Sequence, residues 1–414
     1  MSEPDHYDEL EIRAPDERER ELFLALPAQI AHAQAQTTAY AELLHDVDPD
    51  RVIYRDALSR LPITRKSELI ELQEKTPPFG GFVADEALPG AKVFASPGPL
   101  YEPEGDASNY WRLARACYAA GFRAGDLVHN TFSYHFTPAG SMLESGARAL
   151  GCTVFPAGTG NTELQAQTLA RLCPQAYTGT PSFLKILLEK VRDLGLHCGS
   201  LTKALVSGEA LPPSLRADVE ALDVHVLQCY ATADLGLIAY ESPAKEGMII
   251  DEELIAEIVR PGTGDPVPDG EVGEVVVTTF NKTYPLIRFA TGDLSAVMSG
   301  ISPCGRTNMR IKGWMGRADQ ATKVKGMFVH PSQVDQVLKR HPEVFKGRLV
   351  VMNDGTKDQM TLFCEVKDKD NDALRKAIND SLREVSKVKG QTELVAPGSL
   401  ANDGKVIDDV RTYT

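Results

Sequence analysis

Residues 175–207 read QAYTGTPSFLKILLEKVRDLGLHCGSLTKALVS and decide the fold. The stretch begins and ends with short apolar runs, Gln175–Gly179 and Lys203–Ser207, which are typical of buried strands. Between them, Ser182–Leu194 has apolar residues at helical spacing. A strand, a helix and a second strand in this order predict two parallel strands joined by a crossover helix.

The same alternation extends on both sides of this stretch. Further buried strands are predicted at 127–131, 152–156 and 225–228, and helices at 110–120, 141–150, 164–172 and 213–221. The repeated unit predicts a mostly parallel sheet with helices on both faces. Ligands of such sheets bind at the carboxyl ends of the strands, so we expect the site there.

The flanking regions have different patterns. Residues 1 to about 90 are predicted to be mainly helical, the region after Glu241 is β-rich, and the region after Gly316 is a small α+β unit. We therefore expect an α/β protein with two domains. Residues 1–317 form a large N-terminal domain of mostly parallel sheets covered by helices, with a β-rich subdomain, and residues 318–414 form a small, mobile α+β domain.

Composition excludes several classes of protein. The chain has 414 residues and a net charge of −14, which disfavours binding to nucleic acid or to an anionic membrane. We find no apolar run approaching the roughly 18–20 residues of a membrane-spanning helix. The acidic first thirty residues do not resemble a secretory signal, and no pair among the seven cysteines has CxxC spacing. These features predict a reduced, cytoplasmic protein.

Short polar segments rich in glycine follow one another along the chain. They are FASPGPLYEP (94–103), VSGEA (206–210) with QCYATADLG (228–236), YPLIRFATGD (284–293), GRADQATKVKGMFVHPSQV (316–334) and PGSLANDGKVIDD (397–409). In this order they resemble the motifs of the adenylate-forming, AMP-binding acyl-CoA ligases, in the branch that contains phenylacetate–CoA ligase. The resemblance covers roughly residues 90 to 411.

The third segment is the most specific match, and the resemblance implies a nucleotide role for it. Asp293 would bind both ribose hydroxyls of ATP or AMP through charge-assisted hydrogen bonds. The alternative is a turn aspartate that caps the next strand. In the second segment, Gly208 and Glu209 would border the adenine and Tyr230 would stack on it, unless Tyr230 is simply a core aromatic residue at a strand end.

The resemblance also implies the residues that act on phosphate. The family's phosphate-binding hydroxyl falls on an alanine here, and the adjacent Thr232 could replace it. Asp234 stands for the family's glutamate and would help hold Mg²⁺. Lys405 would be the lysine that stabilises charge during adenylation, unless it is an ordinary solvated lysine. Arg317 would reach the nucleotide and Asp319 would be the hinge between the domains, unless the segment is an exposed turn.

The first segment departs from the family's phosphate loop. Ser96 and Gly98 match it, but Glu102 stands where relatives have lysine, and Pro99 removes a backbone donor. A carboxylate would repel the phosphates. Either Mg²⁺ bridges Glu102 to them, or the loop points away and Arg317 and Lys405 supply the charge, which we favour. The alternative is an ordinary loop before a helix.

Two observations concern specificity and metals. Phe132, Tyr134, His135 and Phe136 lie where relatives have the wall of the acyl pocket, and they would suit a flat aromatic acid, or else they are core residues. Cys304 resembles half of a zinc-binding Cys-x-Cys segment, but no His/Cys cluster lies near it in the sequence, so we expect no zinc.

The implied reaction has two steps. A small carboxylic acid, aromatic in our reading, reacts with Mg-ATP to give an acyl-adenylate, and coenzyme A then displaces AMP. Positioning and charge stabilisation suffice, because no protein nucleophile is needed. Two alternatives remain: transfer of the acyl group to an amine or a carrier-protein thiol, and a family member that binds a nucleotide or acyl-CoA without ligation. A homodimer is one option for the assembly.

Overall fold

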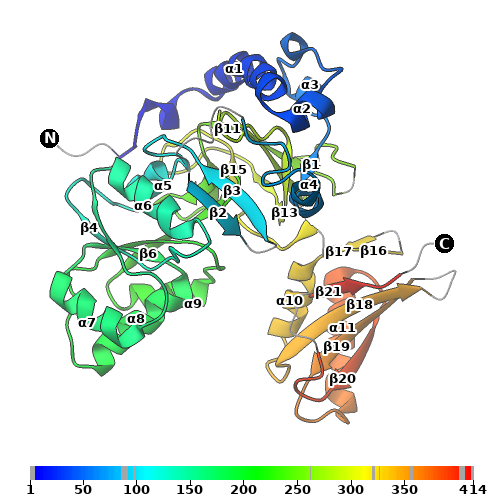
Figure 1. Ribbon diagram of the computed structural model, residues 1–414. Coiled ribbons are helices and arrows are strands. Elements are labelled where there is room, and N and C mark those ends of the chain that lie inside the picture. Colours follow the sequence, from blue (N-terminus) through cyan, green and yellow to red (C-terminus); the bar gives the residue numbers. More distant parts are fainter. Residues whose placement is uncertain are drawn as a thin grey trace. The chain divides into compact units, whose positions relative to one another are not determined.

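The computed structural model of the protein describes residues 5–84, 92–96, 99–261, 263–318, 322–325, 327–353, 358–400 and 406–411. They form two compact units (Figure 1). The first comprises Met1–Thr291 and Ser295–Trp314, and the second comprises Gly292–Leu294 and Met315–Thr414. The division into functional domains after residue 317 stays a prediction.

The largest sheet of the first unit has nine strands, in the order β14-β15-β10-β9-β8-β7-β6-β4-β5. Its parallel part consists of β5 (Thr153–Pro156), β4 (Leu127–Asn130), β6 (Ala176–Gly179), β7 (Lys203–Val206) and β8 (His225–Thr232). The antiparallel part consists of β9 (Gly236–Glu241), β10 (Met248–Ile250), β15 (Arg310–Ile311) and β14 (Val297–Met298). The predicted α/β architecture is confirmed.

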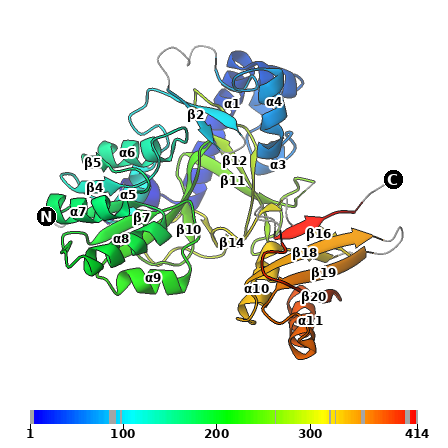
Figure 2. The same cartoon turned by 60° about the horizontal axis from the view of Figure 1, so that its bottom comes forward.

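Helices cover both faces of the parallel strands (Figure 2). Side chains alternate between the faces of a strand, so neighbouring residues enter different cores. Tyr177 and Val206 pack among residues of α7 (Thr162–Leu172), α8 (Pro181–Asp193) and α9 (Pro213–Glu220). Ala176 and Leu205 pack among residues of α5 (Ala114–Ala119) and α6 (Ala139–Ala149). This arrangement leaves the carboxyl ends of the strands for the loops that carry the motifs.

The N-terminal arm packs on a second sheet of the first unit. The arm contains η1 (Glu9–Ile12), α1 (Pro15–Gln36), α2 (Thr38–Leu43), η2 (Pro49–Arg51), α3 (Arg55–Leu58), β1 (Thr64–Arg65), η3 (Lys66–Glu68) and α4 (Leu69–Lys75). The sheet has the order β1-β13-β12-β11, with β13 (Phe289–Ser295), β12 (Gly273–Thr279) and β11 (Leu254–Val259). Leu26 and Ile30 of α1 are fully buried in the same core as Ile255 and Val277. A hairpin of β2 (Lys92–Ser96) and β3 (Leu100–Glu104) completes this unit.

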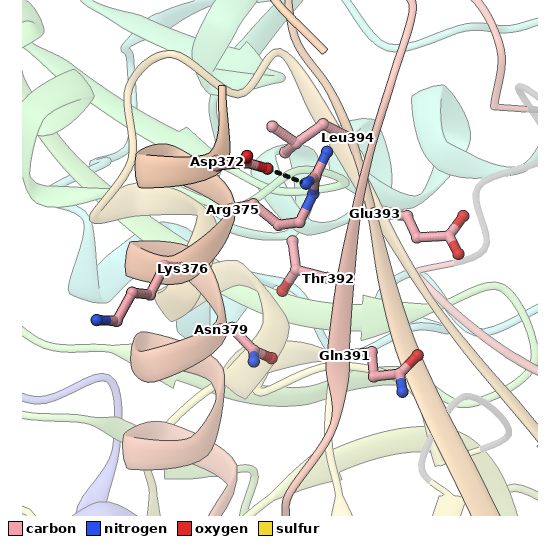
Figure 3. Close-up of a pocket in the computed structure, with 8 residues that line it drawn as sticks. All are labelled: Asp372, Arg375, Lys376, Asn379, Gln391, Thr392, Glu393 and Leu394. Atoms are coloured by element: carbon pink, nitrogen blue, oxygen red, sulfur yellow. Dashed lines mark hydrogen bonds and ion pairs between the residues drawn. The ribbon is translucent and has the colours of Figure 1, made fainter. Parts of the chain in front are cut away.

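The second unit is the expected small α+β fold. A sheet in the order β20-β19-β18-β21 contains β20 (Gln391–Val395), β19 (Asp358–Glu365), β18 (Lys346–Asn353) and β21 (Ile407–Asp409). Its other elements are α10 (Pro331–Lys339), α11 (Asp372–Ser386) and the hairpin β16 (Thr322–Val324) and β17 (Met327–Val329). An open groove of about 650 Å³ lies between α11 and β20, where Arg375 pairs with Asp372 (Figure 3). No residue that we predicted for the site lines this groove.

Candidate active site

The second and third sequence segments meet in the first unit. The hydroxyl of Tyr230, near the end of β8, donates a hydrogen bond to Thr291 Oγ1 over 3.1 Å. Thr291 in turn donates to the backbone carbonyl of Val275 over 3.1 Å. These two bonds connect the end of β8 with β13 and β12, so the ring of Tyr230 has a fixed position.

Asp293 and Arg317 are neighbours in the second unit. Arg317 Nη1 donates to Asp293 Oδ1 over 3.2 Å, and only 9% of Asp293 is exposed. Gly292 lies between them with φ of +76°, and a Cβ at that position would lie 2.6 Å from Arg317 Nη2. Glycine is therefore required both by the backbone conformation and by the close approach of the guanidinium. The structure brings together two residues that the sequence assigned to the nucleotide.

The turn after β8 places Thr232 and Asp234. Thr232 Oγ1 accepts the N–H of Leu235 over 3.2 Å, which shapes the turn into β9. The carboxylate of Asp234 is completely buried, and its Oδ2 lies 2.5 Å from Lys66 Nζ at the start of η3. Its Oδ1 has no hydrogen-bond partner within the described part of the chain. Lys66 therefore supplies the positive charge beside a motif carboxylate.

Sequence reasoning missed Lys66. The residue is 168 positions from Asp234 in the chain and lies in the helical arm, to which the sequence assigned no chemistry. A lysine at the start of a short helix is usually solvated, so no local signal identified it.

The predicted phosphate loop is a β-hairpin. Alternation along β3 turns Leu100 and Glu102 to the buried side and Tyr101 to the exposed side. The carboxyl of Glu102, only 1% exposed, accepts a hydrogen bond from Ser96 Oγ over 2.5 Å. The hydroxyl of Ser96 therefore points to a carboxyl within the protein.

Titratable groups from three other segments, Lys66, Asp234 and Tyr284, interact electrostatically with Glu102 or its surroundings. Burial raises the pKa of its carboxyl to about 8, the negative charge of Asp234 adds to that rise, and Lys66 and Ser96 oppose it. Burial, with Asp234 and Glu102, also raises the pKa of the Tyr284 hydroxyl well above its ordinary value. Burial and the negative charge of Asp234 therefore favour the protonated form of Glu102, because one ammonium cannot neutralise two buried carboxylates.

A glutamine of the N-terminal arm fixes this hairpin. The side-chain amide of Gln73 donates to the carbonyl of Tyr101 and accepts from its N–H, both over 2.9 Å. The pair of bonds imitates a strand partner and attaches β3 to α4. The hairpin is thus held at its edge by Gln73, and its two strands are joined by the hydrogen bond between Ser96 and Glu102.

The segment after β7 is more exposed. Gly208 has φ of +79°, a left-handed conformation that favours glycine. Glu209 is exposed and accepts a hydrogen bond over 2.5 Å from Ser182 Oγ in the first turn of α8. Gly98, Asp319 and Lys405 lie outside the described residues.

The four predicted acyl-pocket residues have different surroundings. Phe132 is buried, and its Cε1 lies 3.6 Å from the point that a Cβ on Gly208 would occupy. Tyr134 is partly buried, whereas His135 is exposed and Phe136 is 82% exposed. Phe132 thus faces the loop after β7, and Phe136 projects into solvent.

Comparison with known proteins agrees with this arrangement. The family model described as "AMP-binding enzyme" matches residues 107–281, and "AMP-binding enzyme C-terminal domain" matches residues 326–410. Phenylacetate–coenzyme A ligase of Thermus thermophilus is 33% identical over 356 residues, which are 81% of this chain and 79% of that protein. The chain belongs to the AMP-binding enzymes. The resemblance seen in the sequence, to the branch of phenylacetate–CoA ligases, is confirmed.

Other AMP-binding enzymes match over most of their length. The phenylacetate–coenzyme A ligase of Escherichia coli is 28% identical over 381 residues, or 87% of this chain and 85% of that protein. A crystal structure of 2-hydroxyisobutyryl-CoA ligase with 2-HIB-AMP and CoA superposes with a TM-score of 0.84, covering 99% of this chain and 95% of that one, at 24% identity. A structure of the same ligase in its postadenylation state superposes with a TM-score of 0.77, covering 99% of this chain and 93% of that one, at 25% identity. These likenesses confirm the fold.

The described part of this AMP-binding enzyme contains no group of three His, Cys, Asp or Glu residues that could hold a metal ion. Cys304 Sγ instead lies 3.1 Å from Ser302 Oγ and 3.5 Å from Arg306 Nη1. All seven cysteines are free thiols. Among the described residues, no helix is long and apolar enough to cross a membrane.

Proposed function

We propose that this AMP-binding enzyme is an acid–thiol ligase that joins an aromatic carboxylic acid to coenzyme A at the expense of ATP. The observation that carries the proposal is the hydrogen bond from Tyr230 to Thr291, because it unites two motifs that are far apart in the sequence. The similarity to phenylacetate–coenzyme A ligases along most of the chain supports it.

In the first step, an oxygen of the substrate carboxylate bonds to the α-phosphorus of ATP and pyrophosphate leaves. In the second step, the thiol of coenzyme A attacks the acyl carbon, loses its proton and releases AMP. Asp293 would bind the ribose, and Gly208, Glu209 and Tyr230 would border the adenine. Thr232 would donate to the α-phosphate.

The cations of this chain would stabilise the phosphate charge. Lys66 already lies beside Asp234 in the first unit, and Arg317 and Lys405 are the other candidates. The free oxygen of Asp234 fits Mg²⁺, which takes one or two protein carboxylates together with phosphate oxygens. Bound Mg²⁺ would neutralise charge on the leaving pyrophosphate. Asp319 would be the hinge, and the enzyme would act in the cytoplasm, where its thiols stay reduced.

A second candidate follows from the hairpin. Ser96 donates its hydrogen bond to Glu102 within the protein, and the loop lysine of relatives is missing. These features favour a protein that binds a nucleotide or an acyl-CoA without ligation.

Acid-dependent release of pyrophosphate distinguishes the candidates. We expect release with ATP, Mg²⁺ and at least one member of a panel of aryl and alkyl acids, and formation of a thioester when coenzyme A is added. Release without thioester formation would instead indicate another acceptor. Release with no acid of the panel, from protein that binds AMP, would overturn the ligase proposal.

A further inference from the structure

Asn130 is the last residue of β4, and its side chain makes three hydrogen bonds to the segment that follows. Its Nδ2 donates to Tyr134 Oη over 2.8 Å and to the carbonyl of Gly140 over 2.9 Å. Its Oδ1 accepts the N–H of Phe132 over 3.2 Å. Residue 130 is fully buried, so these partners replace water completely.

The three bonds specify an amide. The carbonyl of Gly140 can only accept, and the N–H of Phe132 can only donate, so the residue at 130 must present both a donor and an acceptor. A carboxylate of the same shape could accept from the N–H of Phe132 and from the hydroxyl of Tyr134, but it could not donate to the carbonyl of Gly140. It would also face the carbonyl of Gly140, which repels it.

The segment 131–140 is closely packed around these bonds. A Cβ on Gly140 would lie 2.7 Å from the carbonyl oxygen of Ser133 and 2.9 Å from the ring of Tyr134. On its outer side, the N–H of Ala95 in β2 donates to the carbonyl of Phe136 over 2.8 Å. The segment is therefore held from within by Asn130 and from outside by the hairpin.

The fixed segment determines where Phe132 lies. A Cβ on Gly208 would be 3.6 Å from Phe132 Cε1 and 3.8 Å from Thr180 Cγ2. Phe132, Thr180 and Gly208 follow three adjacent parallel strands, β4, β6 and β7. The aromatic ring thus lies at the carboxyl edge of the sheet, where ligands of such sheets bind.

We propose that Asn130 is a positioning residue for the acyl substrate, holding the segment 131–140 so that the ring of Phe132 presents a surface to an aromatic acid. Asn130 itself does not touch the substrate. The inference rests on the proposed ligase function and extends it to the basis of acid selectivity.

The test compares Asn130→Asp with wild type in the pyrophosphate-release assay, with phenylacetate and propionate as acids. We expect the ratio of kcat/KM for phenylacetate to that for propionate to fall about tenfold, the equivalent of one or two lost hydrogen bonds. The KM for ATP should stay within about twofold, because the changed bonds lie in the acyl segment.

Two further variants make the result specific. Asn308 is also buried, and its Nδ2 donates to the carbonyl of Ile250 over 2.9 Å, so Asn308→Asp makes the same chemical change elsewhere in the unit. It should lower Tm without changing acid selectivity. Gly140→Ala displaces the segment without altering Asn130, so it should reproduce the loss of selectivity even if Asn130→Asp folds poorly.

Calorimetric titration of phenylacetate in the presence of AMP separates this inference from the ligase proposal. Wild type that binds phenylacetate but releases no pyrophosphate would overturn ligation alone. A folded Asn130→Asp variant that binds phenylacetate as tightly as wild type would overturn the positioning role alone. The positioning role would also be overturned if wild type does not bind phenylacetate. Equal changes of acid selectivity in the Asn130 and Asn308 variants would overturn that role as well.

Discussion

Replacing Glu102 with glutamine should stabilise the protein at neutral pH. The buried carboxyl has a pKa of about 8, against an ordinary value of 4.5. Between these values the native state holds a proton that the unfolded state has lost, so the free energy of unfolding falls by about 1.4 kcal/mol per pH unit as pH rises. From pH 4.5 to pH 7 the free energy of unfolding therefore falls by roughly 3 kcal/mol.

Glutamine keeps an acceptor for the hydroxyl of Ser96 but needs no proton. The stability gained in Glu102→Gln should therefore be close to zero near pH 4.5 and should rise to roughly 3 kcal/mol at pH 7. Glu102→Lys, which restores the residue of relatives, should have the opposite effect. It would place a second ammonium near Lys66 with only Asp234 to balance both, and an uncompensated buried charge costs about 3–5 kcal/mol.

Urea unfolding at several pH values between 5 and 8 measures these differences. Glu104→Gln is the matched control, because Glu104 lies on the same strand and its carboxylate pairs with the exposed Lys92 over 3.0 Å. It should change stability by less than about 1 kcal/mol throughout. A gain in Glu102→Gln that does not vary with pH, or a Glu102→Lys variant as stable as wild type, would refute the reasoning.

Three further variants test the site. Asp293→Ala should weaken AMP binding by roughly 1.5–3 kcal/mol through lost bonds to the ribose, and unchanged affinity in calorimetry would exclude that role. Lys405→Ala should lose acid-dependent pyrophosphate release yet still convert supplied acyl-adenylate and coenzyme A to the thioester; equal loss of both half-reactions would contradict a role in adenylation alone. Lys66→Ala should lower stability by roughly 2–3 kcal/mol, because the buried carboxylate of Asp234 loses its partner, and the double variant with Asp234→Ala should recover part of it. If the stability losses of the Lys66→Ala and Asp234→Ala variants simply add in the double variant, the two residues do not interact.

Much of the fold was predictable because apolar periodicity is a local signal. The helix expected at 182–194 is observed as Pro181–Asp193, and the strand expected at 203–207 as Lys203–Val206. The hairpin of β2 and β3 was not predicted. Its sequence, residues 92–104, contains three prolines and four carboxylates or hydroxyls, a composition typical of loops. Only tertiary contacts such as those of Gln73 make it a pair of strands.

Candidate site residues could be named from the sequence where a motif is contiguous. The segment 284–293 pointed to Asp293 and another segment to Arg317, and the structure places the two in contact, while their roles toward the nucleotide stay predictions. The contact between Lys66 and Asp234 has no such signal, because it joins residues 168 positions apart. The burial of Glu102 was not predicted either, since a glutamate in a segment rich in proline and glycine is usually exposed. Its carboxyl accepts from Ser96 within the protein, and which groups supply the charge beside the phosphates stays a prediction.

The altered loop is best understood as a change in where the positive charge is located. The resemblance seen in the sequence implies a loop lysine where this chain has Glu102, a carboxyl whose pKa burial raises, and an ammonium from the N-terminal arm lies beside Asp234 instead. Lys66 is already held 2.5 Å from a buried carboxylate, whereas a lysine on a mobile loop would lose conformational entropy on meeting the nucleotide. Such preorganisation lowers the entropic cost of placing a cation near phosphate. If Lys66 acts on the phosphates as we propose, it would have to exchange part of its interaction with Asp234 for the incoming charge. Asp234 would be the carboxylate that holds Mg²⁺, and the ion would supply positive charge beside the phosphates in addition to that of Lys66.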